Sequence, residues 1–116
     1  MKMDSETINK ENQGRLVMFS GTECVHCKEM DPLIEQLEKE TGLHIVHVEV
    51  WHNSDNAAWL EEIDKNQDGS TFCGGIPFFF NEKTGKRLCG NQKYERLKAW
   101  ALGQEMPKPN LQQNSA

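Results

Sequence analysis

Residues 20–32 read SGTECVHCKEMDP and place Cys24 and Cys27 three positions apart. Beyond the second cysteine, apolar side chains recur at intervals of three and four as far as Leu37, which is the period of a helix that buries one face. Gly42 follows the last of these turns and is a residue that commonly ends a helix. The stretch therefore predicts a helix that begins at the two cysteines.

The two thiols at the start of this helix predict redox chemistry. Thiols at positions i and i+3 can form a disulfide, and the exposed N–H groups and positive dipole at a helix start favour a thiolate on the first of them. We therefore expect Cys24 to attack a disulfide and Cys27 to resolve the mixed disulfide. His26 lies between them, and two interpretations stay open: its imidazole favours the Cys24 thiolate, or it is a solvated residue at the rim of the motif.

The rest of the pattern predicts strands and helices that alternate in an α/β fold. Strands are expected at residues 15–20, 44–51, 76–80 and 86–90, and helices at 24–41, 55–66 and 92–102. A helix joins the first two strands, so these should be parallel, whereas NEKTG at residues 81–85 should close an antiparallel hairpin. Ser54 or Asp55 is the expected cap of the second helix, and Asn91 that of the third. The result is a central four-stranded mixed sheet flanked by helices.

The length and charge of the chain narrow the class of protein. Its 116 residues suffice for one domain, expected over 15–103, with a polar N-terminal extension at 1–14 and a flexible C-terminal tail at 104–116. The net charge of −5 comes from scattered acidic residues, which argues against a nucleic-acid partner. No apolar run approaches the ~20 residues of a membrane span, and the start lacks the apolar centre of a signal peptide. The expected location is the cytoplasm or the interior of an organelle.

From about residue 15 to residue 103 the chain resembles the thioredoxin family. The resemblance rests on C-x-x-C at a helix start after a strand, on a proline five residues past the second cysteine, and on GGIPFFF, residues 74–80, before a hairpin. It implies a thioredoxin-like fold and thiol–disulfide exchange on protein substrates, with a second redox protein that resets the pair and no cofactor. It also implies a cis bond before Pro77 and contact between Gly75, Ile76 and Pro77 and a bound polypeptide.

The chain departs from the usual family pattern at its motif and in the strand before it. The family usually carries W-C-G-P-C, whereas Val25 and His26 lie between the cysteines here, and a histidine at the second inner position is similar to protein disulfide isomerases and bacterial disulfide oxidases. We expect a more oxidising pair as a result. Met18 replaces the family's buried aspartate. His47 aligns approximately with a family lysine near that acid, and it is either a substitute base or a hydrogen-bonded structural residue.

Cys73 and Cys89 allow three interpretations from the sequence. They form a disulfide with each other, they are separate reduced thiols, or Cys73 is a third redox thiol that exchanges with the first pair. If the hairpin turn centres on Lys83 and Thr84, Cys89 lies opposite Phe78. Zinc is a rival for all four sulfurs, but these two cysteines do not complete a second C-x2-C unit, so we expect no metal site.

Two further alternatives concern a metal and the function. DKNQDG at residues 64–69 begins like a calcium loop, but Gly75 occupies the position of the bidentate glutamate, so a polar turn is expected. The alternative to an oxidoreductase is a thioredoxin-fold binding module whose cysteines are redox-silent. A zinc-binding domain is the third possibility in order of preference.

Overall fold

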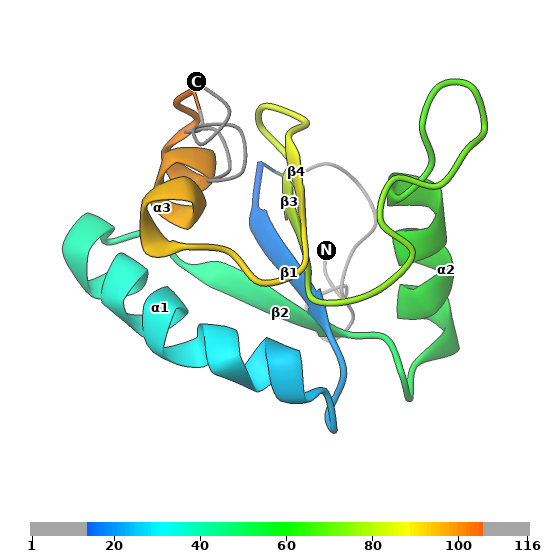
Figure 1. Ribbon diagram of the computed structural model, residues 1–116, viewed down its shortest axis with the longest axis horizontal. Helices are drawn as coiled ribbons and strands as arrows, with labels where there is room; N and C mark the ends of the chain where they lie inside the picture. Colours follow the sequence, from blue (N-terminus) through cyan, green and yellow to red (C-terminus); the bar gives the residue numbers. More distant parts are fainter. Residues whose placement is uncertain (1–13, 106–116) are drawn as a thin grey trace, which may run out of the picture.

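The computed structural model describes residues 14–105. The predicted extension and tail therefore lie outside the described residues, except for positions 14, 104 and 105. The described elements follow one another as β1 Leu16–Ser20, α1 Val25–Thr41, β2 Ile45–Glu49, α2 Ser54–Ile63, β3 Phe78–Asn81, β4 Arg87–Cys89 and α3 Tyr94–Leu102 (Figure 1). This order confirms the predicted succession of strands and helices.

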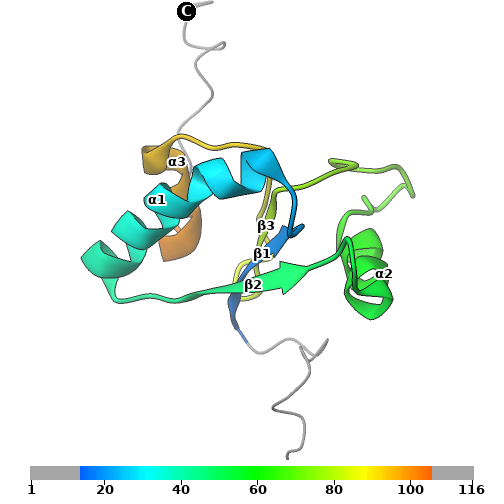
Figure 2. The ribbon, with the colours of Figure 1, turned by 90° about the horizontal axis from the view of Figure 1, so that it is seen from below.

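The strands form one mixed sheet in the order β2-β1-β3-β4. β1 is parallel to β2, as expected for strands joined by a helix, and antiparallel to β3, which pairs with β4 as a hairpin. α1 and α3 cover one face of the sheet, and α2 covers the other (Figures 1 and 2). The arrangement confirms the predicted α/β fold.

Alternation along β1 divides the core between the two faces of the sheet. Leu16 and Met18 pack under α1 and α3, whereas Val17 and Phe19 face α2, because successive side chains of a strand point to opposite faces. On the α2 side the ring of Trp59 meets the ring of Phe19 edge-on, with 5.0 Å between the centroids. β1 is therefore buried on both faces, as its uninterrupted apolar sequence predicts.

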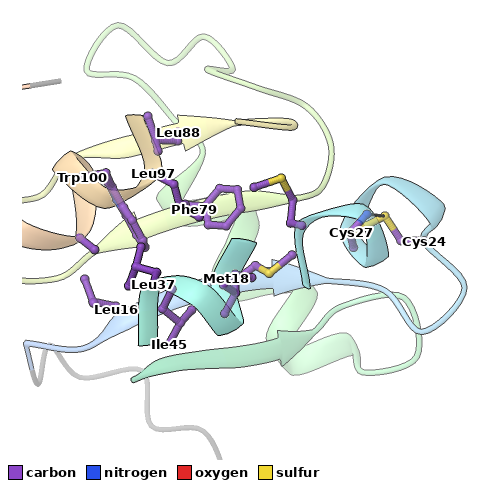
Figure 3. Packing of buried hydrophobic residues seen from close by; sticks show 13 residues of the cluster. Leu16, Met18, Cys24, Cys27, Leu37, Ile45, Phe79, Leu88, Leu97 and Trp100 are labelled. Atoms are coloured by element: carbon purple, nitrogen blue, oxygen red, sulfur yellow. Dashed lines mark hydrogen bonds between the residues drawn. A yellow bond between two sulfur atoms is a disulfide. The ribbon is translucent and has the colours of Figure 1, made fainter. Parts of the chain in front are cut away.

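The core under α1 and α3 extends from the cysteine pair to Trp100. Figure 3 shows Cys24 and Cys27 at one end of this cluster and Trp100 at the other. Trp100 is fully buried, and its indole N–H donates to the carbonyl of Lys86, 3.1 Å away. The buried Asn81 amide in turn donates to the carbonyl of Trp100 at 2.9 Å. These bonds fix α3 against the hairpin, so the cysteine pair lies on a packed frame.

The helix caps agree with the sequence in part. Gly42 ends α1 with a φ of 76°, the left-handed conformation that a glycine adopts without steric cost. The expected caps of α2 are wrong, because the Asn53 side chain accepts from the N–H of Asn56 at 3.0 Å and starts that helix. The expected Asn91 cap of α3 is also wrong, because this side chain donates to Glu29 of α1 at 2.7 Å. Without a side-chain cap, α3 begins only after Lys93.

Candidate active site

Cys24 is the N-cap residue of α1. Its φ of −79° and ψ of 110° are extended, and its Sγ accepts a hydrogen bond from the N–H of Cys27 at 3.1 Å. Its own N–H donates to the carbonyl of Gly21 at 3.0 Å, which holds the turn between β1 and the helix. The N–H of Cys27 and the helix dipole therefore both favour negative charge on the first sulfur.

The sulfurs of Cys24 and Cys27 are joined as a disulfide. Their Cα atoms are 5.2 Å apart, within the range of disulfide geometry. The residues keep only 5% and 4% of their surface exposed and belong to the apolar cluster under α1 and α3. Little of either residue is therefore open to solvent.

His26 lies on the exposed side of the motif, with 71% of its side chain accessible to solvent. Its Nδ1 is 3.1 Å from an Oε1 atom of Glu29, one turn further along α1. The hydrogen bond with His26, together with that from Asn91, holds the pKa of Glu29 below its ordinary value. The predicted effect of His26 on the Cys24 thiolate stays a prediction. A positive charge on the His26 ring would interact with the Glu29 carboxylate as well as with the thiolate.

The cysteine loop is joined to Glu49, the last residue of β2, and to His52, which follows this strand. The carboxylate of Glu49 accepts from the N–H and hydroxyl of Thr22 and from the N–H of His52. Burial opposes the ionisation of Glu49, but these hydrogen bonds outweigh it and lower the pKa of the carboxyl. The ring of His52 lies 2.8 Å from Glu23, whose hydrogen bond and charge raise the pKa of the imidazole. Thr22 and Glu23, the two residues before Cys24, are thus both held by contacts with the end of β2 and the residues after it.

Exposed apolar side chains lie beside the motif. Val25 is 65% exposed and Trp51 is 51% exposed, which is unusual for side chains of this kind. The indole of Trp51 covers Gly21, where an added Cβ would lie within 3.0 Å of several ring atoms. Gly21 therefore allows the tryptophan to pack against the turn that leads to Cys24.

The segment before β3 lies next to the same site. The Ile76–Pro77 peptide bond is cis, and the N–H of Gly90 donates to the Pro77 carbonyl at 2.8 Å. Ile76 is half-buried and packs against the cluster that contains both active-site cysteines. Together with Gly75 and Trp51 it also lines a hollow of about 450 Å³ against α2, which we call the Trp51 groove. Gly75, Ile76 and Pro77 are the three predicted substrate-binding positions, and their role stays a prediction.

Cys73 and Cys89 form a second disulfide, with Cα atoms 5.5 Å apart. Cys89 lies opposite Phe78 in the hairpin register, as expected, and the loop before β3 brings Cys73 to it. Asp64 fixes this loop, because its two carboxylate oxygens accept from the N–H groups of Cys73 and Gly74 at 2.7 and 2.8 Å. Of the three open interpretations the structure therefore supports the mutual disulfide.

The geometry places the four sulfurs in two separate pairs. Within residues 14–105, no three histidine, cysteine, aspartate or glutamate side chains come together in a way that could hold a metal ion. The stretch that resembles a calcium loop instead folds as a turn, in which Asp68 accepts from the N–H and hydroxyl of Ser70. The first acidic residue of this stretch, Asp64, accepts hydrogen bonds from the loop of the second disulfide.

A smaller cleft of about 170 Å³ opens beside the second cysteine, and we call it the Cys27 cleft. Met18, which replaces the expected acid, lines it together with Cys27, His47 and Asp31. His47 is the residue whose role the sequence left open. Sequence reasoning missed Asp31, although its position four residues after Cys27 on a helix was a signal that both lie on one face. It also missed Asp64, for which the sequence offers no comparable signal.

A protein-family model described as Thioredoxin matches residues 3–102 of the chain. A comparison with curated proteins finds no match. None of the helices in the described part of the chain has the length and apolar character needed to cross a membrane.

Proposed function

Since the chain belongs to the thioredoxin family, we propose that it is a thiol–disulfide oxidoreductase that acts on protein disulfides or thiols through Cys24 and Cys27. The observation that carries the proposal is the hydrogen bond from the N–H of Cys27 to Sγ of Cys24 at the first turn of α1. The same N–H would stabilise a thiolate in the reduced protein.

The proposed cycle is a pair of exchange steps. In the reducing direction the Cys24 thiolate attacks one sulfur of a substrate disulfide, and the other substrate sulfur leaves as a thiolate. Cys27 then loses its proton and attacks Sγ of Cys24, which releases the second substrate thiolate and leaves the Cys24–Cys27 disulfide. The oxidising direction is the reverse of these steps. A second redox protein restores the starting state, and the cycle requires no cofactor.

The substrate polypeptide is proposed to lie along Gly75, Ile76 and Pro77. Ile76 joins the apolar cluster of the cysteines and also lines the Trp51 groove, so a chain laid across it would approach the disulfide. The exposed surfaces of Val25 and Trp51 would be covered by such a partner. Burial of the two cysteines supports this close docking, because small solutes find little sulfur exposed.

We also propose that the reduction potential of the Cys24–Cys27 pair is less negative than that of a typical thioredoxin. A protonated His26 beside the motif would stabilise the reduced form and make the disulfide more oxidising than that of a typical thioredoxin. Its contact with Glu29 moderates this effect. Replacement of Glu29 by glutamine should therefore move the potential of the pair to a less negative value, and replacement of His26 by glutamine to a more negative one.

Trapping of a mixed disulfide tests the proposal. The Cys27→Ser variant, incubated with a disulfide-containing protein such as insulin, should accumulate a covalent adduct that peptide mass mapping assigns to Cys24. The Cys24→Ser variant is the matched control and should form no such adduct at Cys27 at a comparable rate. Absence of the adduct, together with absence of insulin reduction by the unaltered protein, would leave the redox-silent binding module as the better account.

A further inference from the structure

We propose that the Cys27 cleft is the proton-transfer site of the second cysteine and that His47 accepts the Cys27 proton when the mixed disulfide is resolved. The inference rests on the proposed function and adds to it the residue that performs the proton transfer. Its basis is the placement of His47, Met18 and Cys27 around one small solvent-connected cleft.

The strand register places His47 on the face of the sheet that α1 covers. Ile45 belongs to the core beneath α1, whereas Val46 and Val48 pack toward α2. Because side chains of a strand alternate, His47 shares the α1 face with Ile45. It is also the register partner of Met18 in β1, and Met18 belongs to the same cluster as Cys27.

Met18 leaves Cys27 without an acid or base on β1. The thioether carries no group that could take a proton near neutral pH, and the other β1 residue in the cleft is Ser20. The nearest strand that offers such a group is β2, one position outward in the sheet. The titratable side chain of the cleft, His47, therefore comes from the edge strand β2, where the cleft is open to solvent.

Within residues 14–105, His47 differs from the other histidines because no carboxylate pairs with its ring. The rings of His26, His44 and His52 each lie within 3.2 Å of a glutamate oxygen. Among the contacts of residues 14–105, neither the ring of His47 nor the carboxylate of Asp31 makes a hydrogen bond or ion pair. The ring is thus available to accept a proton.

The charged groups that face His47 across the cleft come from α1. They are Lys28 and Asp31, of opposite sign, while the lining from β1 and the turn after it carries no charge. An imidazole is a stronger base than a carboxylate and is the side chain most often used as a general base. We therefore assign the acceptor role to His47 and not to Asp31.

The proton moves through the cleft and the atoms balance. Neutral His47 takes the proton of the Cys27 thiol, directly or through water, for which 170 Å³ leaves room because a water occupies about 30 Å³ in the liquid. The Cys27 thiolate attacks Sγ of Cys24, the bond from that sulfur to the substrate breaks, and the substrate leaves as a thiolate. The imidazolium then returns the proton to solvent or to the leaving thiolate. In the oxidising direction the imidazolium protonates Cys27 as it leaves.

Quenched-flow measurement of the two steps tests the proposal. Reduced protein is mixed with an aromatic disulfide, quenched in acid, and analysed by peptide mass mapping, which follows the Cys24 adduct and its conversion to the Cys24–Cys27 disulfide separately. For His47→Gln we expect the conversion at pH 7 to slow by about 10- to 100-fold, within the usual range of general base catalysis, with formation of the adduct unchanged. The pH dependence of the conversion rate should also change, because the group that takes the Cys27 proton is then no longer an imidazole.

Two matched variants make the result specific. His44→Gln removes an exposed histidine that lies just before β2 and outside the cleft, and it should leave both steps unchanged. Asp31→Asn should slow the conversion less than His47→Gln does. Conversion at the unaltered rate in His47→Gln, or a loss confined to Asp31→Asn, would overturn the proposal. Failure of the Cys24 adduct to form at all would instead refute the proposed function.

Discussion

Removal of the second disulfide should destabilise the fold by an amount that follows from the length of the loop it closes. Cys73 and Cys89 are separated by 16 positions. In the chain-entropy model a loop of that length contributes about 3 kcal/mol at 25 °C, because the cross-link restricts the unfolded chain. Cys24 and Cys27 are separated by only 3 positions, and the same relation gives about 1.5 kcal/mol for them.

Urea unfolding of the oxidised proteins, followed by tryptophan fluorescence, measures the two contributions. The double variant with serine at positions 73 and 89 should lose about 3 kcal/mol, and the matched double variant with serine at 24 and 27 about half as much. The loop should stay folded in the first variant, because Asp64 still binds its N–H groups. A larger loss from the variant at 24 and 27, or a loss below about 1 kcal/mol at 73 and 89, would refute this reasoning.

Three further predictions follow from contacts outside the cysteines. Asp64→Ala should lower the free energy of unfolding by about 2–4 kcal/mol, because two loop N–H groups lose a charged acceptor. Asp64→Asn should lower it by less. Equal urea midpoints for Asp64→Ala and the unaltered protein would contradict this prediction. His52 should titrate above its ordinary pKa by NMR, because Glu23 favours the imidazolium, and Glu23→Gln should bring the midpoint back down. This contact favours the folded state at low pH, and its effect disappears as the pH rises through the raised pKa of His52. An unchanged titration midpoint of His52 in Glu23→Gln would argue against the contact. Burial and the hydrogen bond to Glu40 raise the pKa of Tyr94 to about 12, so ultraviolet titration of Glu40→Gln should show ionisation at lower pH, and identical curves would contradict the assignment.

The sequence predicted those parts of the fold that depend on local patterns. The period of the apolar residues and the glycine at position 42 located α1, and the apolar runs located the strands, because these signals act within a few neighbouring residues. The caps of α2 and α3 were wrong for a different reason. Asn53 and Asp55 are equally good caps by composition, and the alternative use of Asn91 depends on Glu29, which lies far away in the sequence.

In the candidate site, too, only the local features could be predicted from the sequence. The cysteine motif and its place at a helix start could be predicted because all the participating groups lie within a few residues. The pairing of Cys73 with Cys89 could not be decided, since it depends on how the loop after α2 returns to the hairpin. Asp64 holds this loop in place by accepting hydrogen bonds from two of its backbone N–H groups. The residues around Asp64 in the sequence do not predict these bonds. The placement of His47 and Cys27 around one cleft likewise depends on the strand register.

The central claim is that the Cys24–Cys27 disulfide is a reversible redox couple, and its redox titration tests that claim most directly. The protein is equilibrated in thiol–disulfide buffers of defined potential, and alkylation with peptide mass mapping reports each cysteine separately. We predict a single two-electron transition of this pair between about −180 and −120 mV. A pair that stays fully oxidised below about −300 mV, as structural disulfides do, would contradict the account.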